Sequence, residues 1–297
     1  MSVALPRPAS AHQNGAGIAS MLLAVLLYGL MDALIKIEAG RYPIIEVVFF
    51  RSLFALLPLA WLVRRNGGWP ALRTRQPGLQ LVRAVTGFIS LFCFFQAFAL
   101  MPLADVVAIG FAAPIFITAL SVPLLGEQVG WRRWSAVLTG FAGVMVMVRP
   151  GAGVFNLAAG VALLATLTYA LSIIVIRRLS TTDGSAATVA SFTGFAVLGA
   201  GVMLPFCWVM PALEDWLLLA AAGLLGGAGQ IAFTRAFALA PPVVVAPFDY
   251  ANMLLATALG YMIWGDVPTA PVFVGAALVI ASGLYIVYRE AIRRGTA

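Results

Sequence analysis

The sequence predicts an all-α membrane protein with ten transmembrane helices, arranged as an inverted repeat of two five-helix halves. The first observation behind this prediction is composition: 62% of the 297 residues are hydrophobic, 10% are charged, and the mean hydropathy is +1.01. Soluble proteins contain about 45–50% apolar and about 25% charged residues. Several apolar stretches also reach the length of about 20 residues that a membrane-spanning helix needs, and they lack the alternation of a barrel strand.

The second observation is an internal repeat. The segment Ala-Phe-Ala-Leu at positions 97–100 recurs at 236–239, and the glycine–acid pair at 126–127 recurs with the same offset at 265–266. The starts of the two halves are related by a slightly larger offset, which aligns Tyr28 with Tyr169 and Lys36 with Arg177. The repeat divides the chain into a first half, residues 1–150 with a polar tail at 1–15, and a second half, residues 151–297.

Apolar runs place five helices in each half. They are expected at 16–36, 43–63, 78–100, 103–125 and 131–148, and then at 156–176, 186–209, 216–239, 242–264 and 271–288. The breaks between them are rich in glycine, serine, charged residues and proline, and proline cannot continue a helical hydrogen-bond ladder. We interpret the first run as a retained helix rather than a cleaved signal, because charged residues and further spans follow it directly.

The basic residues test this map, since cytoplasmic loops of membrane proteins are enriched in lysine and arginine. With the N-terminus in the cytoplasm, 14 of the 18 basic residues lie on the inside, whereas Lys36, Arg41 and Arg149 lie outside and Arg51 lies within a span. Both termini are therefore predicted to be cytoplasmic. The inside set comprises Arg7, Arg64, Arg65, Arg73, Arg75, Arg83, Arg132, Arg133, Arg177, Arg178, Arg235, Arg289, Arg293 and Arg294.

Five spans per half is an odd number, so the second half must enter the membrane from the opposite side. Inverted repeats of this kind typically hold a substrate site near the membrane midplane and give alternating access as the halves rock. The architecture therefore indicates a secondary transporter.

Three sequence features resemble the drug/metabolite transporter superfamily, specifically its EamA-type ten-helix members. They are the repeated Ala-Phe-Ala-Leu-x-Pro turn, the ends at 126–127 and 265–266, and the run Phe-Arg-Ser at 50–52. The resemblance covers nearly the whole chain. It implies a secondary transporter or facilitator in the bacterial inner membrane, and it is greatest to exporters of aromatic amino acids. The implied function is export of aromatic and other mostly neutral amino acids with broad specificity.

An alternative function follows from the same superfamily, whose members also carry riboflavin, S-adenosylmethionine or nucleotide sugars. The stretch at 246–250 is similar to some of those uptake branches. Uptake of another metabolite, such as riboflavin or S-adenosylmethionine, is therefore the second function that the resemblance implies.

Ionisable residues at membrane depth are the first site candidates, because each costs about 2.5–3.5 kcal/mol on insertion scales unless it has a partner or a use. Asp249, about two turns into the ninth span, either pairs structurally with Arg235 or serves as a substrate ammonium contact or coupling proton site. Their counterparts in the first half are Gly110 and Gln96. Because the repeat does not require the pair, the asymmetry favours a specialised role for Asp249.

Three further charges lie near the outer ends of the first two spans. Asp32 and Lys36 are four residues apart on one helix face, a spacing that favours an ion pair. Arg51 either reaches Asp32 or binds a substrate carboxylate, and we favour the structural role for all three. Asp266 is interpreted as a helix-end group.

A cavity for amino acids requires neutral hydrogen-bonding groups and aromatic faces, with few fixed charges. Tyr28 and Tyr169 occupy equivalent mid-span positions in the two halves. Pro114 and Pro247 are expected to kink their spans and act as gating hinges, and four glycines between 223 and 229 are expected to permit close helix packing. The remaining substrate-binding candidates are Gln96, Ser172, Gln230, Tyr250 and Asn252.

The sequence argues against an enzyme. Its one histidine, His12, lies in the polar tail, so neither a zinc protease motif nor a buried serine–histidine site can form. A Gly-x-x-x-x-Gly-Lys loop for ATP is also missing, and neither a cofactor nor a metal is expected. The expected partners are a small-molecule substrate of the amino-acid class and the lipid bilayer. Nucleic acid is not expected, and a monomer would suffice.

Overall fold

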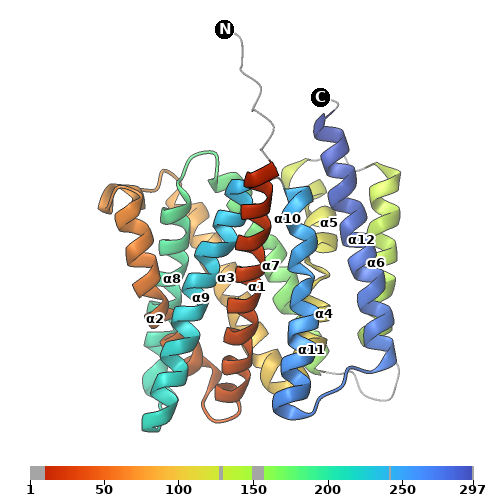
Figure 1. Ribbon diagram of the computed structural model, residues 1–297. Helices are drawn as coiled ribbons and strands as arrows, with labels where there is room; N and C mark the ends of the chain where they lie inside the picture. The colour runs from red at the N-terminus through yellow and green to blue at the C-terminus, as the bar shows by residue number, and fades with distance from the viewer. Residues whose placement is uncertain (1–10, 127–129, 149–156, 241, 296–297) are drawn as a thin grey trace.

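The chain folds into a bundle of long helices that lie side by side (Figure 1). The computed structural model describes residues 11–126, 130–148, 157–240 and 242–295. The first helix begins and the last helix ends on the same face of the bundle, which we call the terminal face (Figure 1). The turn after the first helix lies on the other side, which we call the opposite face.

Each half contributes a similar series of helices. The first half contains α1 (Ala11–Ala39), α2 (Ile44–Arg65), the short 3-10 helix η1 (Trp69–Leu72), α3 (Pro77–Leu100), α4 (Leu103–Gly110), α5 (Ala113–Leu125) and α6 (Trp131–Val148). The second contains α7 (Leu157–Leu179), α8 (Ser185–Met203), the 3-10 helix η2 (Leu204–Phe206), α9 (Leu213–Leu239), α10 (Pro242–Asp249), α11 (Ala251–Trp264) and α12 (Ala270–Gly295).

Seven helical segments of the described chain are long and apolar enough to cross a membrane, with α4 and α5 counted as one segment, Leu103–Leu125. Three shorter apolar helices lie at Trp134–Met147, Ala251–Trp264 and Ala270–Tyr285. The all-α membrane fold is therefore present. The count of ten spans and the cytoplasmic position of both termini stay predictions.

The expected single helices at 103–125 and 242–264 were wrong in one respect, since each is interrupted near its middle. The first interruption lies at Phe111 and Ala112, and the second lies at Tyr250. At each interruption a backbone hydrogen bond spans three residues instead of the four of an α-helix. These bonds run from Ala112 N–H to the Ile109 carbonyl and from Met253 N–H to the Tyr250 carbonyl. Phe111 and Tyr250, which are equivalent positions of the repeat, meet edge to face with ring centroids 4.9 Å apart. The two interruptions therefore contact each other.

The sequence repeat is reproduced in backbone conformation. Met101 and Ala240 are both extended and both donate their N–H groups to the carbonyl four residues earlier, at 3.0 and 3.1 Å. Gly126 and Gly265 end α5 and α11 in the left-handed region, with φ of 67° and 71°. Glycine adopts such values with the least strain, because it has no Cβ, which explains a glycine at both helix ends.

Helix packing follows the same symmetry. α1 packs against α9 as α3 packs against α7, while α2 packs against its own counterpart α8, and α6 against α12. The glycines of α9 permit close approach, as expected: a Cβ at Gly223 would lie 2.5 Å from Phe54 Cβ, and one at Gly227 would overlap Pro58. In a membrane such close backbone packing takes the place of a hydrophobic driving force.

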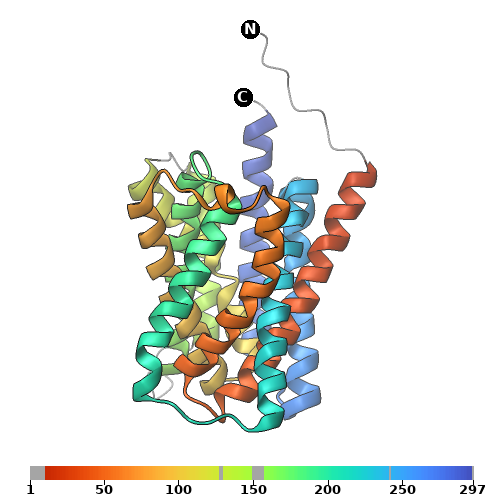
Figure 2. The same ribbon diagram turned by 90° about the vertical axis from the view of Figure 1, so that its left-hand side faces the viewer.

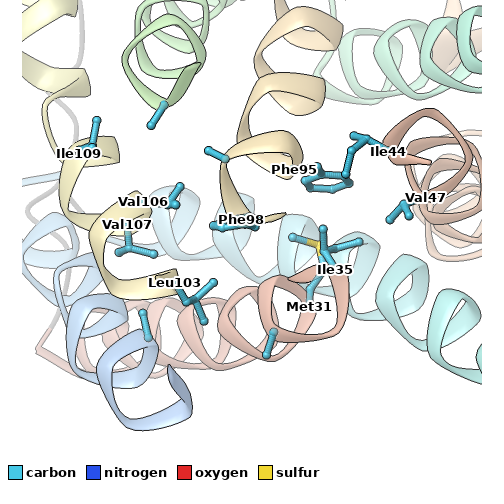
Figure 3. Close-up of a cluster of buried hydrophobic side chains, with 14 of the residues drawn as sticks. Met31, Ile35, Ile44, Val47, Phe95, Phe98, Leu103, Val106, Val107 and Ile109 are labelled. Atoms are coloured by element: carbon cyan, nitrogen blue, oxygen red, sulfur yellow. The ribbon is translucent and has the colours of Figure 1, made fainter. Parts of the chain in front are cut away.

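The buried apolar core centres on α1, α2, α3 and α4 (Figure 3). Phe95 and Phe98 of α3, which are 2% and 4% exposed, lie within it and fix the position of α3 against α1. The helices α2, α8 and α9 form the side of the bundle that faces the viewer in Figure 2.

Candidate functional site

A cavity lies between α2, α3, α8 and α9. Its empty space, counted together with the solvent at its open mouth, is about 490 Å³. Its lining combines two arginines with neutral polar groups and apolar side chains. The residues that contribute to the lining are Arg51, Ala55, Leu59, Leu62, Arg83, Val189, Phe192, Thr193, Gly226, Gly227, Gln230 and Ile231.

Arg51 enters the cavity from the middle of α2. Its Nη2 lies 3.7 Å from the sulfur of Met31, a weak acceptor, and its Nε is buried with no hydrogen-bond partner among the described residues. Gly226 of α9 makes room for it, because a Cβ there would lie 2.9 Å from Arg51 Nη2. The structure thus places this predicted residue in a cavity and not in an ion pair.

Arg83 lines the same cavity, and the sequence reasoning did not select it as a candidate. It lies near the start of α3, so the charge count assigned it to the cytoplasmic set that fixes topology. Its guanidinium lies over the Phe192 ring, 4.5 Å from the centroid, and its Nε and Nη1 are buried with no hydrogen-bond partner in the described chain. The available signal was its position within an apolar helix rather than in the loop before it.

Gln230 and Tyr28 form a polar contact between α9 and α1. The Tyr28 hydroxyl donates to Gln230 Oε1 at 2.8 Å, and its ring meets Phe233 edge to face. Since the Gln230 oxygen is engaged, its amide nitrogen remains as a donor beside the cavity. Both residues were predicted, and the structure brings them together.

Four predicted residues outside the cavity lining interact electrostatically with the two cavity arginines or with one another. Arg51 interacts with Asp32 and Tyr28, and Arg83 interacts with Tyr169. Tyr169 in turn interacts with Asp249. These interactions connect the four residues to the cavity arginines, although none of their carboxylates lines the cavity in the part of the chain that the structure describes.

The ion pairs expected from the sequence differ from those in the structure. Arg235 is exposed and makes no ion pair with Asp249, and Asp32 pairs within 4 Å with neither Lys36 nor Arg51, as far as the described side chains show. Lys36 instead binds Asp266 at 3.0 Å and donates to the Met101 carbonyl at 3.3 Å. Asp266 thus joins α1 to the α11–α12 connection and is more than a helix-end group.

A second polar link on the opposite face centres on Asp215, which is 3% exposed at the start of α9. It pairs with Arg41 and accepts the Tyr42 hydroxyl at 2.6 Å. That hydrogen bond raises the pKa of Tyr42 above its ordinary value, because ionised tyrosine could no longer donate. The α1–α2 turn is thereby tied to the start of α9.

The terminal face carries an equivalent link. Asp183 in the α7–α8 turn accepts from the Thr74 hydroxyl, the Arg75 backbone N–H at 2.9 Å and Gln80 Nε2 at 2.8 Å. These bonds, with that of Thr74 the strongest, lower the pKa of Asp183 to about 2. The α2–α3 connection is therefore held against the α7–α8 turn.

The remaining candidates occupy packing positions. Ser172 Oγ and Asn252 Oδ1 are buried with no hydrogen-bond partner among the described residues, and Asn252 faces Gly29 of α1. Gln96 is half-buried on α3. Tyr250 packs at the helix interruptions. Pro114 is the second residue of α5, just after the first interruption, whereas the Pro247 side chain lies outside those that the structure describes.

Metal ligands do not gather in the described residues, where no group of three or more His, Cys, Asp or Glu could hold an ion. Cys93 and Cys207 are both free thiols. The chemistry available at the cavity is therefore that of guanidinium, amide and hydroxyl groups against an apolar wall.

Known transporters are similar to this chain along nearly its whole length. The pseudopaline exporter CntI of Pseudomonas aeruginosa is 32% identical over 90% of this chain and 94% of its own. A riboflavin transporter of Vibrio cholerae is 29% identical over 94% and 95%, and an S-adenosylmethionine uptake transporter of Rickettsia prowazekii is 26% identical over 92% and 93%. These relatives support the superfamily, while amino acids as the substrate stay a proposal.

The fold is shared with a solved crystal structure. That structure has a TM-score of 0.65 and 19% sequence identity, and the match covers 95% of this chain and 99% of the other. The family model of the EamA-like transporter family matches twice, over residues 15–149 and 156–288. The protein is therefore a membrane transporter that belongs to the EamA-like transporter family.

Proposed function

We propose that the protein is a secondary transporter or facilitator that exports amino acids across the bacterial inner membrane by alternating access. The observation that carries the proposal is the cavity between α2, α3, α8 and α9, which places Arg51, Gln230 and an apolar wall around one space. An amino acid presents a carboxylate, an ammonium group and a side chain, and the cavity region offers a complement to each.

The carboxylate is bound by Arg51, whose planar guanidinium can donate two parallel hydrogen bonds. Asp32, which does not line the cavity but lies within electrostatic range of Arg51, supplies the negative charge that attracts the ammonium group. The side chain packs against Ala55, Leu59 and Phe192. Amino acids with neutral side chains of different sizes can therefore bind, because directed hydrogen bonds hold only the polar backbone groups of the substrate.

Export is supported by the similarity to the pseudopaline exporter. The inverted halves would alternate access between the two faces of the membrane, with both termini in the cytoplasm. In this proposal the protein works in the lipid bilayer as a monomer, with a small-molecule substrate and no nucleic acid.

Uptake of another metabolite is the second candidate function. It is favoured by the riboflavin and S-adenosylmethionine transporters, which match this chain over 92% or more of its length. Riboflavin and S-adenosylmethionine are therefore the competing substrates against which amino-acid transport is tested.

Counterflow in liposomes tests the proposal. The purified protein is reconstituted with internal unlabelled phenylalanine, methionine, threonine, riboflavin or S-adenosylmethionine, and entry of the matching labelled compound is measured. We expect amino-acid counterflow that Arg51→Gln reduces by about tenfold or more, as loss of a charge-assisted hydrogen bond predicts. Arg64→Gln, an exposed site on the same helix, is the matched control. Movement of riboflavin without any amino acid would reject the proposal.

Direction is measured separately in cells. Cells that express the protein are preloaded with a labelled amino acid, and its efflux is compared with that of cells that express Arg51→Gln. Faster efflux with the wild-type protein supports export, whereas accumulation of external label would support uptake.

A further inference from the structure

The cavity holds two guanidinium groups where one would satisfy a single carboxylate. Arg51 comes from α2 and Arg83 from α3, and both line the same space. In the described chain the cavity lining includes no aspartate or glutamate, so neither positive charge is matched within it. This differs from the sequence-based expectation of a site with few fixed charges.

The hydrogen-bonding capacity of both arginines is incompletely used. Arg51 Nε, Arg83 Nε and Arg83 Nη1 are buried and have no acceptor among the described residues. The ion pairs that the described residues form involve Lys36 and Arg41 instead. Buried charged donors without acceptors cost free energy, and the cost is relieved by a ligand that supplies the acceptors.

The contacts that the arginines do make are weak ones. Arg83 stacks over Phe192 at 4.5 Å, and Arg51 approaches the Met31 sulfur at 3.7 Å. Each contact positions the guanidinium plane while leaving N–H groups for another partner. The arginines are thus held in place while some of their N–H groups remain available to a ligand.

Two glycines create the space in which the arginines lie. A Cβ at Gly87 of α3 would overlap Arg83 Nη1, and one at Gly226 of α9 would lie 2.9 Å from Arg51 Nη2. The two glycines are separated by the same interval as the two Ala-Phe-Ala-Leu segments, so they are equivalent positions of the repeat. Both halves therefore provide the same opening for one arginine each.

The neutral polar group beside them is also a donor. Gln230 Oε1 already accepts the Tyr28 hydroxyl, and the Gln230 amide nitrogen carries two N–H donors that it can offer to a ligand. A site that presents two guanidinium groups and an amide N–H calls for a ligand rich in acceptors and in negative charge.

We propose that the cavity binds a small molecule with two carboxylate groups, one held by Arg51 and the other by Arg83. This inference rests on the proposed amino-acid transport and adds to its substrates the amino acids and related compounds that carry a second carboxylate. Gln230 donates to the segment between them, and Phe192 covers the carbon chain.

Ligand-induced stabilisation of the full-length protein in detergent tests the inference, because a ligand that binds the folded state raises the unfolding temperature. Matched probes differ in one carboxylate: glutamate against glutamine, 2-aminoadipate against its side-chain amide, and glutarate against its half-amide. We expect each two-carboxylate probe to bind at least about tenfold more tightly than its amide. Equal affinity within all three pairs would overturn the inference.

Substitution of each arginine tests whether both arginines are needed to bind the two carboxylates. Arg51→Gln and Arg83→Gln should each abolish the preference for the second carboxylate, whereas Arg51→Lys and Arg83→Lys should retain part of it because the charge remains. Arg64→Gln should leave the preference unchanged. If a glutamine variant keeps the full preference, that arginine is not the binding group and the inference fails.

Counterflow separates this inference from the proposed function. Transport of phenylalanine or methionine without any advantage for the two-carboxylate probes would reject the inference and leave amino-acid transport standing. Failure of every amino acid and dicarboxylate to bind or move would reject both.

Discussion

The two halves of the molecule share their backbone but differ in the side chains at the cavity. Met101 and Ala240 are extended at the same turn, and Gly126 and Gly265 end equivalent helices in the same left-handed conformation. By contrast, Arg51 in α2 corresponds to Phe192 in α8, at the offset that aligns Tyr28 with Tyr169. The backbone geometry is thus the same in both halves, whereas the positive charge of Arg51 is present in the first half alone at this pair of positions.

Arg83 lines the same cavity as Arg51 and contacts Phe192, the residue that takes the place of Arg51 in the second half. Phe192, the counterpart of Arg51, forms the aromatic surface over which Arg83 lies, whereas the counterpart of Arg83 in α9 is Ala222. The difference teaches that the repeated positions build the scaffold, whereas the side chains that we propose to bind substrate stand at unrepeated positions. The predictions below test whether positions that are equivalent in structure are also equivalent in function.

The largest expected effect comes from locking one half to the other on the opposite face. Lys36 and Asp266 join α1 to the α11–α12 connection at 3.0 Å, and alternating access requires such a link to open. In a background with Cys93→Ala and Cys207→Ala, we expect a short cleavable thiol cross-linker between Lys36→Cys and Asp266→Cys to reduce counterflow to the level of empty vesicles.

Each single-cysteine variant treated with the same reagent is the control, because it lacks the ion pair but cannot be locked. Cleavage of the linker should restore counterflow. Persistent transport after complete cross-linking would show that this link stays closed during the cycle.

The second largest effect is expected from replacing the two equivalent glycines, Gly87 and Gly226, by alanine. Gly87→Ala would displace Arg83, and Gly226→Ala would displace Arg51, since each added methyl group meets a guanidinium nitrogen. We expect both variants to weaken binding of a two-carboxylate probe by roughly tenfold, measured as the ligand-induced shift in unfolding temperature. Gly194→Ala on α8 is the control, because nothing lies within 4 Å of its Cβ. A loss in only one variant would mean that the halves contribute unequally.

The helices of this fold were predictable because apolar runs, prolines and charged loops mark their ends. The interruptions at Phe111 and Tyr250 could not be predicted in the same way. A three-residue backbone hydrogen bond forms at Tyr250, and no residue type there indicates it. Pro114, the nearest signal in the first half, lies just beyond the interruption, at the start of α5. Sequence periodicity thus locates a span better than it locates a break within it.

The position of a polar residue at the cavity was predictable where that residue stands alone in an apolar helix, as with Arg51, Gln230 and its partner Tyr28. Arg83 was missed because a charge near a helix end satisfies the topology rule equally well. The Lys36–Asp266 pair was missed because its members are 230 residues apart, and a partner four residues away offered a local explanation. Long-range pairing depends on how the halves pack, which local spacing does not encode.

A smaller effect is expected from Asp215 on the opposite face. Asp215→Asn removes the charge that pairs with Arg41 and weakens the bond from Tyr42, so we expect the free energy of unfolding to fall by about 1–3 kcal/mol. Thermal unfolding in detergent measures it, with Glu214→Gln at the adjacent exposed position as control. An unchanged unfolding temperature would show that the link does not stabilise the protein.

The smallest effect concerns Asp183, the corresponding link on the terminal face, and it depends on pH. Hydrogen bonds from Thr74, Arg75 and Gln80 favour the carboxylate and lower the pKa of Asp183 to about 2, whereas an unfolded aspartate has a pKa of about 3.9. The folded state therefore binds the proton less readily, and the resulting stability is complete above about pH 4 and is lost as the pH falls through about 2. We expect Asp183→Asn to unfold a few degrees below the wild type at pH 7, with the gap closing between pH 4 and pH 2. A gap that stays constant down to pH 2 would mean that the carboxylate charge contributes nothing, and that the two faces are linked by different physical means.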